Sequence, residues 1–120
     1  MQEKRISVRT HLMGVGARIS KDNKTWTDVD VRDISDGGIC FISKEEFPRG
    51  TTLKLHGNIS DFLRTMEIDC DVKVVFTKDG DEQNSYSLGC KFMYLSKAEQ
   101  TALSIFIELL VTKYPSLLIE

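Results

Sequence analysis

The stretch Val31–Phe41, which reads V-R-D-I-S-D-G-G-I-C-F, decides the fold that we expect of this chain. Its two ends are apolar and typical of strands, whereas the Asp, Ser and Gly residues in the middle are typical of turns. The simplest interpretation is a tight connection between two strands. The order of the residues predicts more, because Asp33 and Ser35 are two apart and leave the same face of an extended chain. Gly37 and Gly38 follow, and without side chains they would let a flat ligand lie against the backbone.

Alternation of apolar and polar residues predicts strands on both sides of this stretch. The predicted strands cover residues 11–20, 25–34, 38–43, 51–56, 66–78 and 85–95. Asp79 and Gly80 form a strong hairpin signal between the last two. Trp26 is out of phase with the alternation in its strand, which predicts a β-bulge near Thr27. Residues 57–65 fit either a loop or a short amphipathic turn.

A helix is predicted over residues 96–114. Residues 96–99, Ser-Lys-Ala-Glu, are a capping box, in which Ser and Glu satisfy each other's free backbone N–H groups. Apolar residues at helical spacing form one stripe: Ala102, Leu103, Phe106, Ile107, Leu110 and Tyr114. Ile105, Leu109 and Val111 widen it, so the helix either covers a barrel on one side or also meets a partner or a second copy of the chain. Six strands and one helix predict a mainly β fold, a small antiparallel six-stranded β-barrel with a C-terminal α-helix.

Length and composition indicate one soluble domain. The chain has 120 residues, enough for a domain that buries its own core. Charged residues make up 28% and hydrophobic residues 41%, which is ordinary for a globular protein. No apolar run approaches the roughly 20 residues of a membrane span, and no basic-then-apolar leader opens the chain. We therefore expect a cytoplasmic protein without membrane insertion.

The charge distribution indicates a small anionic ligand. The net charge of −2 argues against binding of DNA or RNA through the phosphate backbone. Residues 1–20 nevertheless carry four basic side chains against one acidic side chain. A short cationic arm on an acidic body suits a small anion better than a long polyanion.

The cysteines predict neither a metal site nor a bound cofactor. Cys40, Cys70 and Cys90 each lie in an apolar, strand-like run, where a small buried thiol is the usual state. None of them has the spacing of a zinc or redox site, and His11 and His56 are distant from them in sequence.

Two motifs together resemble the signature of the PilZ domain, a bacterial receptor module for cyclic di-GMP. Asp33, Ser35 and Gly38 match its Asp-x-Ser-x-x-Gly motif. Upstream, Arg5 and Arg9 match its Arg-x-x-x-Arg pair. Either motif alone is weakly specific, whereas the two in this order and in a chain of this size are more so.

The resemblance covers essentially the whole chain. Residues 89–92, Gly-Cys-Lys-Phe, resemble the Gly-x-x-Phe stretch that closes the barrel of PilZ domains. The resemblance implies one PilZ-like domain over residues 1–120. Its parts would be a flexible N-terminal arm over residues 1–10, the β-barrel over residues 11–95 and the C-terminal helix over residues 96–114.

The resemblance also implies a site for cyclic di-GMP. The implied binding residues are Arg5, Arg9, Asp33, Ser35, Gly38, Lys4 and Gly37. The two arginines would bind phosphate and guanine, and the Asp and Ser of the motif would hydrogen-bond a guanine base. The glycines would keep the turn open. Lys4 stands where many relatives carry a further arginine, so the charge is kept but the bidentate grip is lost.

The expected function is therefore a receptor without catalytic activity. An enzyme would need a nucleophile with a base, and Ser35 lacks the sequence setting of a hydrolase nucleophile. Residues 1–10 have too few apolar groups to pack, so we expect the ligand to order this arm. The signal would then pass to an unidentified protein partner, and a homodimer through the C-terminal helix is possible.

Two other interpretations stay open. One is a PilZ-like protein–protein interaction module that does not bind nucleotide, although such a module would usually lack the arginines or the Asp-x-Ser-x-x-Gly turn. The other is a small barrel for single-stranded nucleic acid. That function favours aromatic residues interleaved with basic ones, whereas Tyr86, Phe92 and Tyr94 lie among acids as often as bases.

Overall fold

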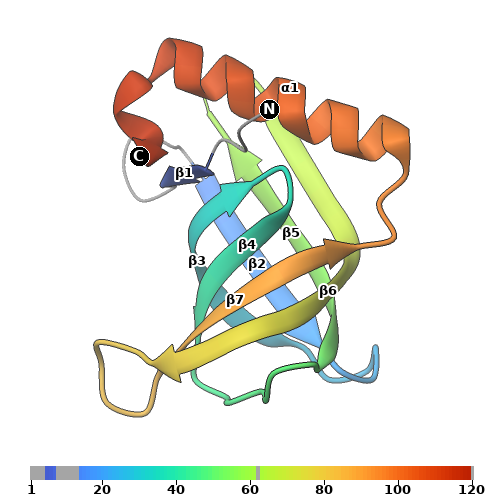
Figure 1. The fold of residues 1–120 in the computed structure, drawn as a ribbon, viewed down its shortest axis with the longest axis vertical. Coiled ribbons are helices and arrows are strands. Elements are labelled where there is room, and N and C mark those ends of the chain that lie inside the picture. Colours follow the sequence, from blue (N-terminus) through green and yellow to red (C-terminus); the bar gives the residue numbers. More distant parts are fainter. Residues whose placement is uncertain (1–4, 8–13, 62, 120) are drawn as a thin grey trace.

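The computed structural model describes residues 5–7, 14–61 and 63–119. In chain order its elements are β1 (Arg5–Ser7), β2 (Gly14–Ser20), β3 (Thr27–Ser35), β4 (Gly38–Ser43), β5 (Thr52–Ser60), β6 (Thr65–Asp79), β7 (Tyr86–Met93), α1 (Lys97–Lys113), a short 3-10 helix (Pro115–Leu117) and β8 (Leu118–Ile119). The strands wrap around a common core, and α1 lies across one end of them (Figure 1).

Six of the described strands close into an antiparallel barrel. Their order is β2-β5-β6-β7-β4-β3, and the pairing of β2 with β3 joins the two ends. This confirms the predicted six-stranded barrel with a C-terminal helix. β3 is shared, because residues 27–29 pair with β2 whereas residues 33–35 pair with β1. β8 pairs with the far edge of β1, so two short strands extend the sheet beside the barrel.

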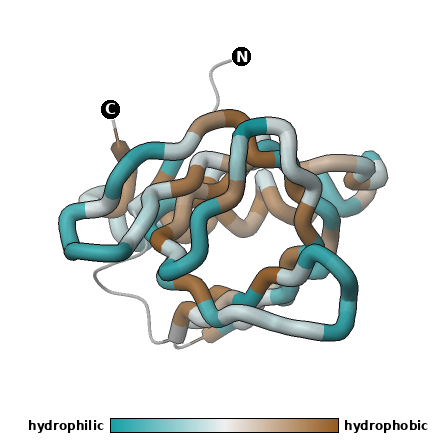
Figure 2. Tube along the Cα trace, turned by 90° about the horizontal axis from the view of Figure 1, so that it is seen from below, coloured by the Kyte–Doolittle hydropathy of each residue, from teal (hydrophilic) through white to brown (hydrophobic). Residues whose placement is uncertain are grey.

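The core fills the barrel and continues under α1. Strand residues such as Phe41, Leu53 and Val72 are fully buried inside. The buried residues of α1 are Leu103, Phe106, Ile107 and Leu110. From the end away from α1, the strands form a ring whose loops are largely hydrophilic (Figure 2).

α1 begins at the predicted capping box. The hydroxyl of Ser96 accepts a hydrogen bond from the Glu99 amide, and the Glu99 carboxylate accepts one from the Ser96 amide, both at 3.0 Å. These two bonds satisfy backbone donors that have no partner within the helix. The helix therefore starts at a fixed place relative to the end of β7.

The prediction of a flexible arm over residues 1–10 is wrong for residues 5–7. These form β1, and Ile6 is 0% exposed and pairs with Ile34. The arm is poor in apolar residues, but one isoleucine between two strand neighbours is enough to dock it. One of those neighbours is Leu118, near the other end of the chain, and no local periodicity reveals such a pairing. Lys4 and Arg9 lie outside the described residues.

Two details of the strand predictions also differ from the structure. The bulge predicted near Thr27 is absent from that place, since Thr27 pairs with Ile19 in regular register. Trp26 lies just before β3 and is half-buried, and its ring makes a cation–π contact, with the Arg18 guanidinium carbon 5.0 Å from the ring centre. The bulge in β3 lies further on, and residues 57–60, which sequence left undecided, extend β5.

Candidate functional site

A β-bulge in β3 turns the residues of the Asp-x-Ser motif outward. The register with β4 shifts between Val31 and Asp33. Val31 and Ile34 are consequently both buried, although they are three residues apart. Without the shift, strict alternation from Val31 would point Asp33 and Ser35 into the core. The bulge therefore places both polar side chains on the outer face of the barrel.

Arg5 lies directly on these two side chains. It pairs with Ser35 in the β1–β3 ladder. Its Nη1 donates to Oδ1 of Asp33 in an ion pair, and its Nη2 donates to the Ser35 hydroxyl at 3.2 Å. The Arg5 and Asp33 side chains are 38% and 21% exposed, so the pair sits at the surface and stabilises the fold little. The structure thus joins residues from the two motifs that the sequence predicted to act together.

Ser35 also holds the turn that follows it. Its hydroxyl oxygen accepts hydrogen bonds from the amides of Gly37 and Gly38, each at 3.2 Å. Ser35 is fully buried beneath Arg5. A ligand would reach the Ser35 hydroxyl only after the Arg5 guanidinium had moved.

Gly38 has a packing role. A Cβ at this position would overlap the carbonyl oxygen of Cys90 in β7, because β4 and β7 approach closely there. The neighbouring Gly37 carbonyl accepts a hydrogen bond from the Phe92 amide at 3.0 Å. The glycines therefore close the turn against β7, whereas the sequence had suggested that they keep it open.

A hollow of about 210 Å³, called here the Asp33 hollow, adjoins the Arg5–Asp33 pair. Its lining includes Arg5, Asp33, Cys40, Val75, Phe76 and Gly89. The register of β6 with β7 shifts between Val74 and Phe76, which leaves Val75 and Phe76 both exposed on the outer face. The Phe76 ring lies so close over Gly89 that a Cβ there would overlap it. Sequence reasoning missed Phe76, and the unbroken apolar run of residues 74–76 was the available signal.

Comparison with known proteins gives the family. The family model for the PilZ domain matches residues 2–109. The chain belongs to the PilZ domain family. No curated protein matches the chain.

Solved PilZ structures share the fold at low sequence identity. The PilZ domain of YcgR from Escherichia coli, solved with c-di-GMP, is 15% identical with a TM-score of 0.70, and the match covers 97% of this chain and 95% of that one. A second structure of YcgR from Escherichia coli in complex with c-di-GMP is 14% identical with a TM-score of 0.77, and the match covers 97% of this chain and 48% of that one. The Bacillus subtilis inhibitor of motility, MotI/DgrA, is 16% identical with a TM-score of 0.73, and the match covers 95% of this chain and 52% of that one. This chain thus spans about half the length of the last two proteins.

The three cysteines of the chain are neutral thiols, and two of them, Cys40 and Cys90, line the Asp33 hollow. Burial raises the pKa of the Cys40 thiol, and the nearby Asp33 carboxylate raises it further. Burial also raises the pKa of Cys70 and of Cys90 to about 12. The three thiols therefore stay protonated near neutral pH. Within the described ranges, no cluster of His, Cys, Asp and Glu is suited to hold a metal ion.

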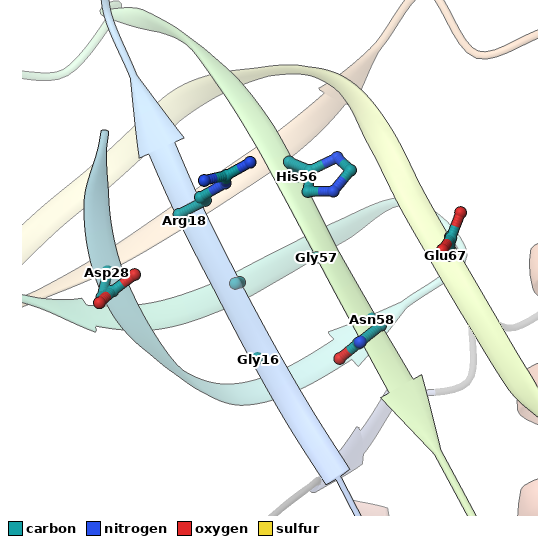
Figure 3. Close-up of a pocket in the computed structure, with 8 residues that line it drawn as sticks. Gly16, Arg18, Asp28, His56, Gly57, Asn58 and Glu67 are labelled. Carbon is teal, nitrogen blue, oxygen red and sulfur yellow. The ribbon is translucent and has the colours of Figure 1, made fainter. Parts of the chain in front are cut away.

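A separate hollow of about 270 Å³ lies on the opposite side of the PilZ barrel, over β2 and β5 (Figure 3). Gly16 and Gly57 form part of its floor, and its charged rim includes Arg18, Asp28 and Glu67. None of the described PilZ motif residues lines it. Of the helices in the described part of the chain, none combines the length and apolar character needed to cross a bilayer.

Proposed function

We propose that this PilZ domain is a receptor for cyclic di-GMP. The observation that carries the proposal is the convergence of Arg5, Asp33 and Ser35 beside the Asp33 hollow, from strands that are distant in sequence. The structures of YcgR with c-di-GMP support it, since they have the same fold. The family consists of receptor modules, and we propose no catalytic activity for this chain.

The chemistry of the hollow fits a guanine nucleotide. The Asp33 carboxylate is an acceptor for the N1–H and N2–H donors of guanine. A guanidinium such as that of Arg5 binds a phosphate in bidentate geometry or contacts guanine O6 and N7. The half-exposed Phe76 ring offers a surface on which a flat base packs. Arg9 and Lys4 would add positive charge from the adjoining segments.

We propose that binding begins with an exchange of partners at Arg5. Its guanidinium now occupies the acceptors of Asp33 and Ser35 that a guanine would use. An incoming nucleotide would take over the Asp33 carboxylate, while Arg5 turns to a phosphate of the same ligand. This replaces the ordering of a wholly free arm, because Ile6 is already docked in the core. The change in β1 would then be transmitted to a protein partner.

A titration with cyclic di-GMP, GTP and a short oligonucleotide tests the proposal. We expect cyclic di-GMP alone to bind tightly. Arg9→Ala should weaken it by about 1.5–3 kcal/mol, the range for a hydrogen bond to a charged group, with little change in melting temperature. Arg49→Ala, an exposed arginine outside the motifs, is the control. If cyclic di-GMP does not bind, the better interpretation is a protein–protein interaction module that does not use a nucleotide. If the oligonucleotide binds more tightly than cyclic di-GMP, the better interpretation is a barrel for single-stranded nucleic acid.

We also propose that α1 pairs with α1 of a second copy. Beside its buried face, the helix exposes a second apolar stripe at spacings of four, three and four residues: Ala98, Ala102, Ile105 and Leu109. The first half of the stripe has two alanines and the second half has Ile105 and Leu109. In an antiparallel pair, the large residues of one helix would therefore pack against the alanines of the other.

The oligomeric state in solution checks this pairing. The wild-type chain should behave as a dimer in size-exclusion chromatography with light scattering. Ile105→Glu should give a monomer, because it places a charge in the middle of the stripe. Lys97→Glu, which also changes an exposed residue of α1 but lies outside the stripe, should leave the dimer intact. A wild-type monomer would exclude the pairing.

A further inference from the structure

A second hollow lies on the same outer face as the Asp33 hollow, further along the β4–β7 pair. Its volume is about 340 Å³, and its lining includes Asp36, Gly37, Lys91, Tyr94 and Gln100. We call it the Tyr94 hollow. Lys91 pairs with Gly38, whereas Gly89 in the floor of the Asp33 hollow pairs with Cys40. The two floors are therefore two residues apart along β7, about 7 Å.

Tyr94 has a backbone conformation that does not suit it. Its φ is 59°, in the left-handed region that glycine and asparagine adopt far more readily than a bulky residue. Tyr94 is 84% exposed, so packing of its ring contributes almost nothing to the stability of the fold. A residue with a strained backbone and no stabilising contacts within the fold is a candidate for a role in binding.

The neighbours of Tyr94 suit a nucleotide. The exposed Lys91 has no ion-pair partner among the described residues, so its ammonium is available to a phosphate. The exposed Tyr94 ring is a flat surface for a base, and stacking on aromatic side chains is a principal way in which proteins hold unpaired bases. The hollow borders Asp36 and Gly37 of the motif turn, so it lies next to the proposed site along the same pair of strands.

We propose that the Tyr94 hollow receives the second guanine of a cyclic dinucleotide whose first guanine lies at Asp33. This inference rests on the proposed function and extends it. Cyclic di-GMP carries two guanines joined through two phosphates. In the proposed function Asp33 and Ser35 hold one guanine while Arg5 turns to a phosphate, so the second guanine still needs a site. Tyr94 would stack on the other base, and Lys91 would contact the phosphate between the two hollows.

Replacement of Tyr94 by asparagine separates this role from a structural one. Because asparagine accepts the left-handed conformation, Tyr94→Asn should raise the melting temperature by a few degrees. The same variant should lose affinity for cyclic di-GMP by about tenfold, within the range for removing one aromatic stacking partner. Tyr94→Phe keeps the ring and should bind like the wild type. Lys91→Ala should also bind cyclic di-GMP more weakly, and its affinity should depend less on salt concentration. Lys97→Ala, on α1, should change neither the affinity nor its salt dependence.

The outcomes distinguish this inference from the function beneath it. If wild-type protein does not bind cyclic di-GMP in the titration, the proposed function fails first. If the wild type binds and Asp33→Ala weakens binding, but Tyr94→Asn binds as tightly as the wild type, the function stands and the second subsite is wrong. Equal losses in Tyr94→Asn and Tyr94→Phe would also overturn the stacking role, because phenylalanine stacks as well as tyrosine.

Discussion

Gly38→Ala should destabilise the protein by about 3 kcal/mol, the upper end of the usual range for overpacking. The added methyl group would overlap the backbone carbonyl of Cys90, which cannot rotate away as a side chain could. Relief requires β4 and β7 to separate beside the motif turn. For a domain of this size the loss corresponds to a fall in melting temperature on the order of 10 °C. Thermal unfolding of the wild type and the variant measures it.

Gly16→Ala is the matched control for this prediction. Gly16 also lies within a barrel strand, but the nearest atom to an added Cβ is Oδ1 of Asn58 at 3.7 Å, an ordinary contact. Alanine there should leave stability unchanged or raise it, because glycine weakens a strand. If Gly38→Ala is as stable as Gly16→Ala, then Gly38 is not needed for the approach of β4 and β7.

Asp33→Ala should reduce the affinity for cyclic di-GMP by about 1.5–3 kcal/mol, equivalent to roughly 10- to 150-fold. The affinity for cyclic di-AMP should change much less. Guanine presents hydrogen-bond donors at N1 and N2 to a carboxylate, whereas adenine presents an acceptor at N1. The variant should therefore narrow the preference for cyclic di-GMP, which parallel titrations with the two ligands would show.

Asp30→Ala is the control for Asp33→Ala. Asp30 is an exposed carboxylate of the same strand on the other side of the bulge, so its removal changes the net charge equally. It should not change the preference between the ligands. A proportional loss of affinity for both ligands in Asp33→Ala would mean that Asp33 only holds Arg5 and the turn. The stability of Asp33→Ala should stay close to that of the wild type, since the ion pair is at the surface.

The parts of the fold that sequence predicted depend on local patterns. Alternation located the six barrel strands, and the capping box at Ser96 located the start of α1. β1 and β8 were missed because each is three residues or fewer and gains its stability from a partner far along the chain. Ile6 is a single buried side chain, so no alternation of apolar and polar residues in the sequence marks it. Its burial follows from the tertiary structure alone.

The candidate site was predictable only on its motif side. Spacing suggested that Asp33 and Ser35 share a face, but it did not reveal the bulge that turns this face outward. Because Trp26 is out of phase with the alternation, the bulge was predicted at the start of the strand, near Thr27, whereas it lies between Val31 and Asp33. The other wall, with Phe76, depends on a second bulge and on Gly89 beneath the ring. Both are properties of paired strands, so neither could be derived from one strand in isolation.

The pairing of β1 with β8 has a consequence for protein engineering. Arg5 pairs with Ser35 on one side and with Ile119 on the other, so both ends of the described chain leave the barrel beside the motif turn. A fluorescent reporter attached beside β1 or beside β8 would start within a few residues of Arg5. The exchange of Arg5 between Asp33 and a ligand would then act on the fusion joint directly. In the proposed function, this geometry would make the domain a suitable starting point for a genetically encoded biosensor.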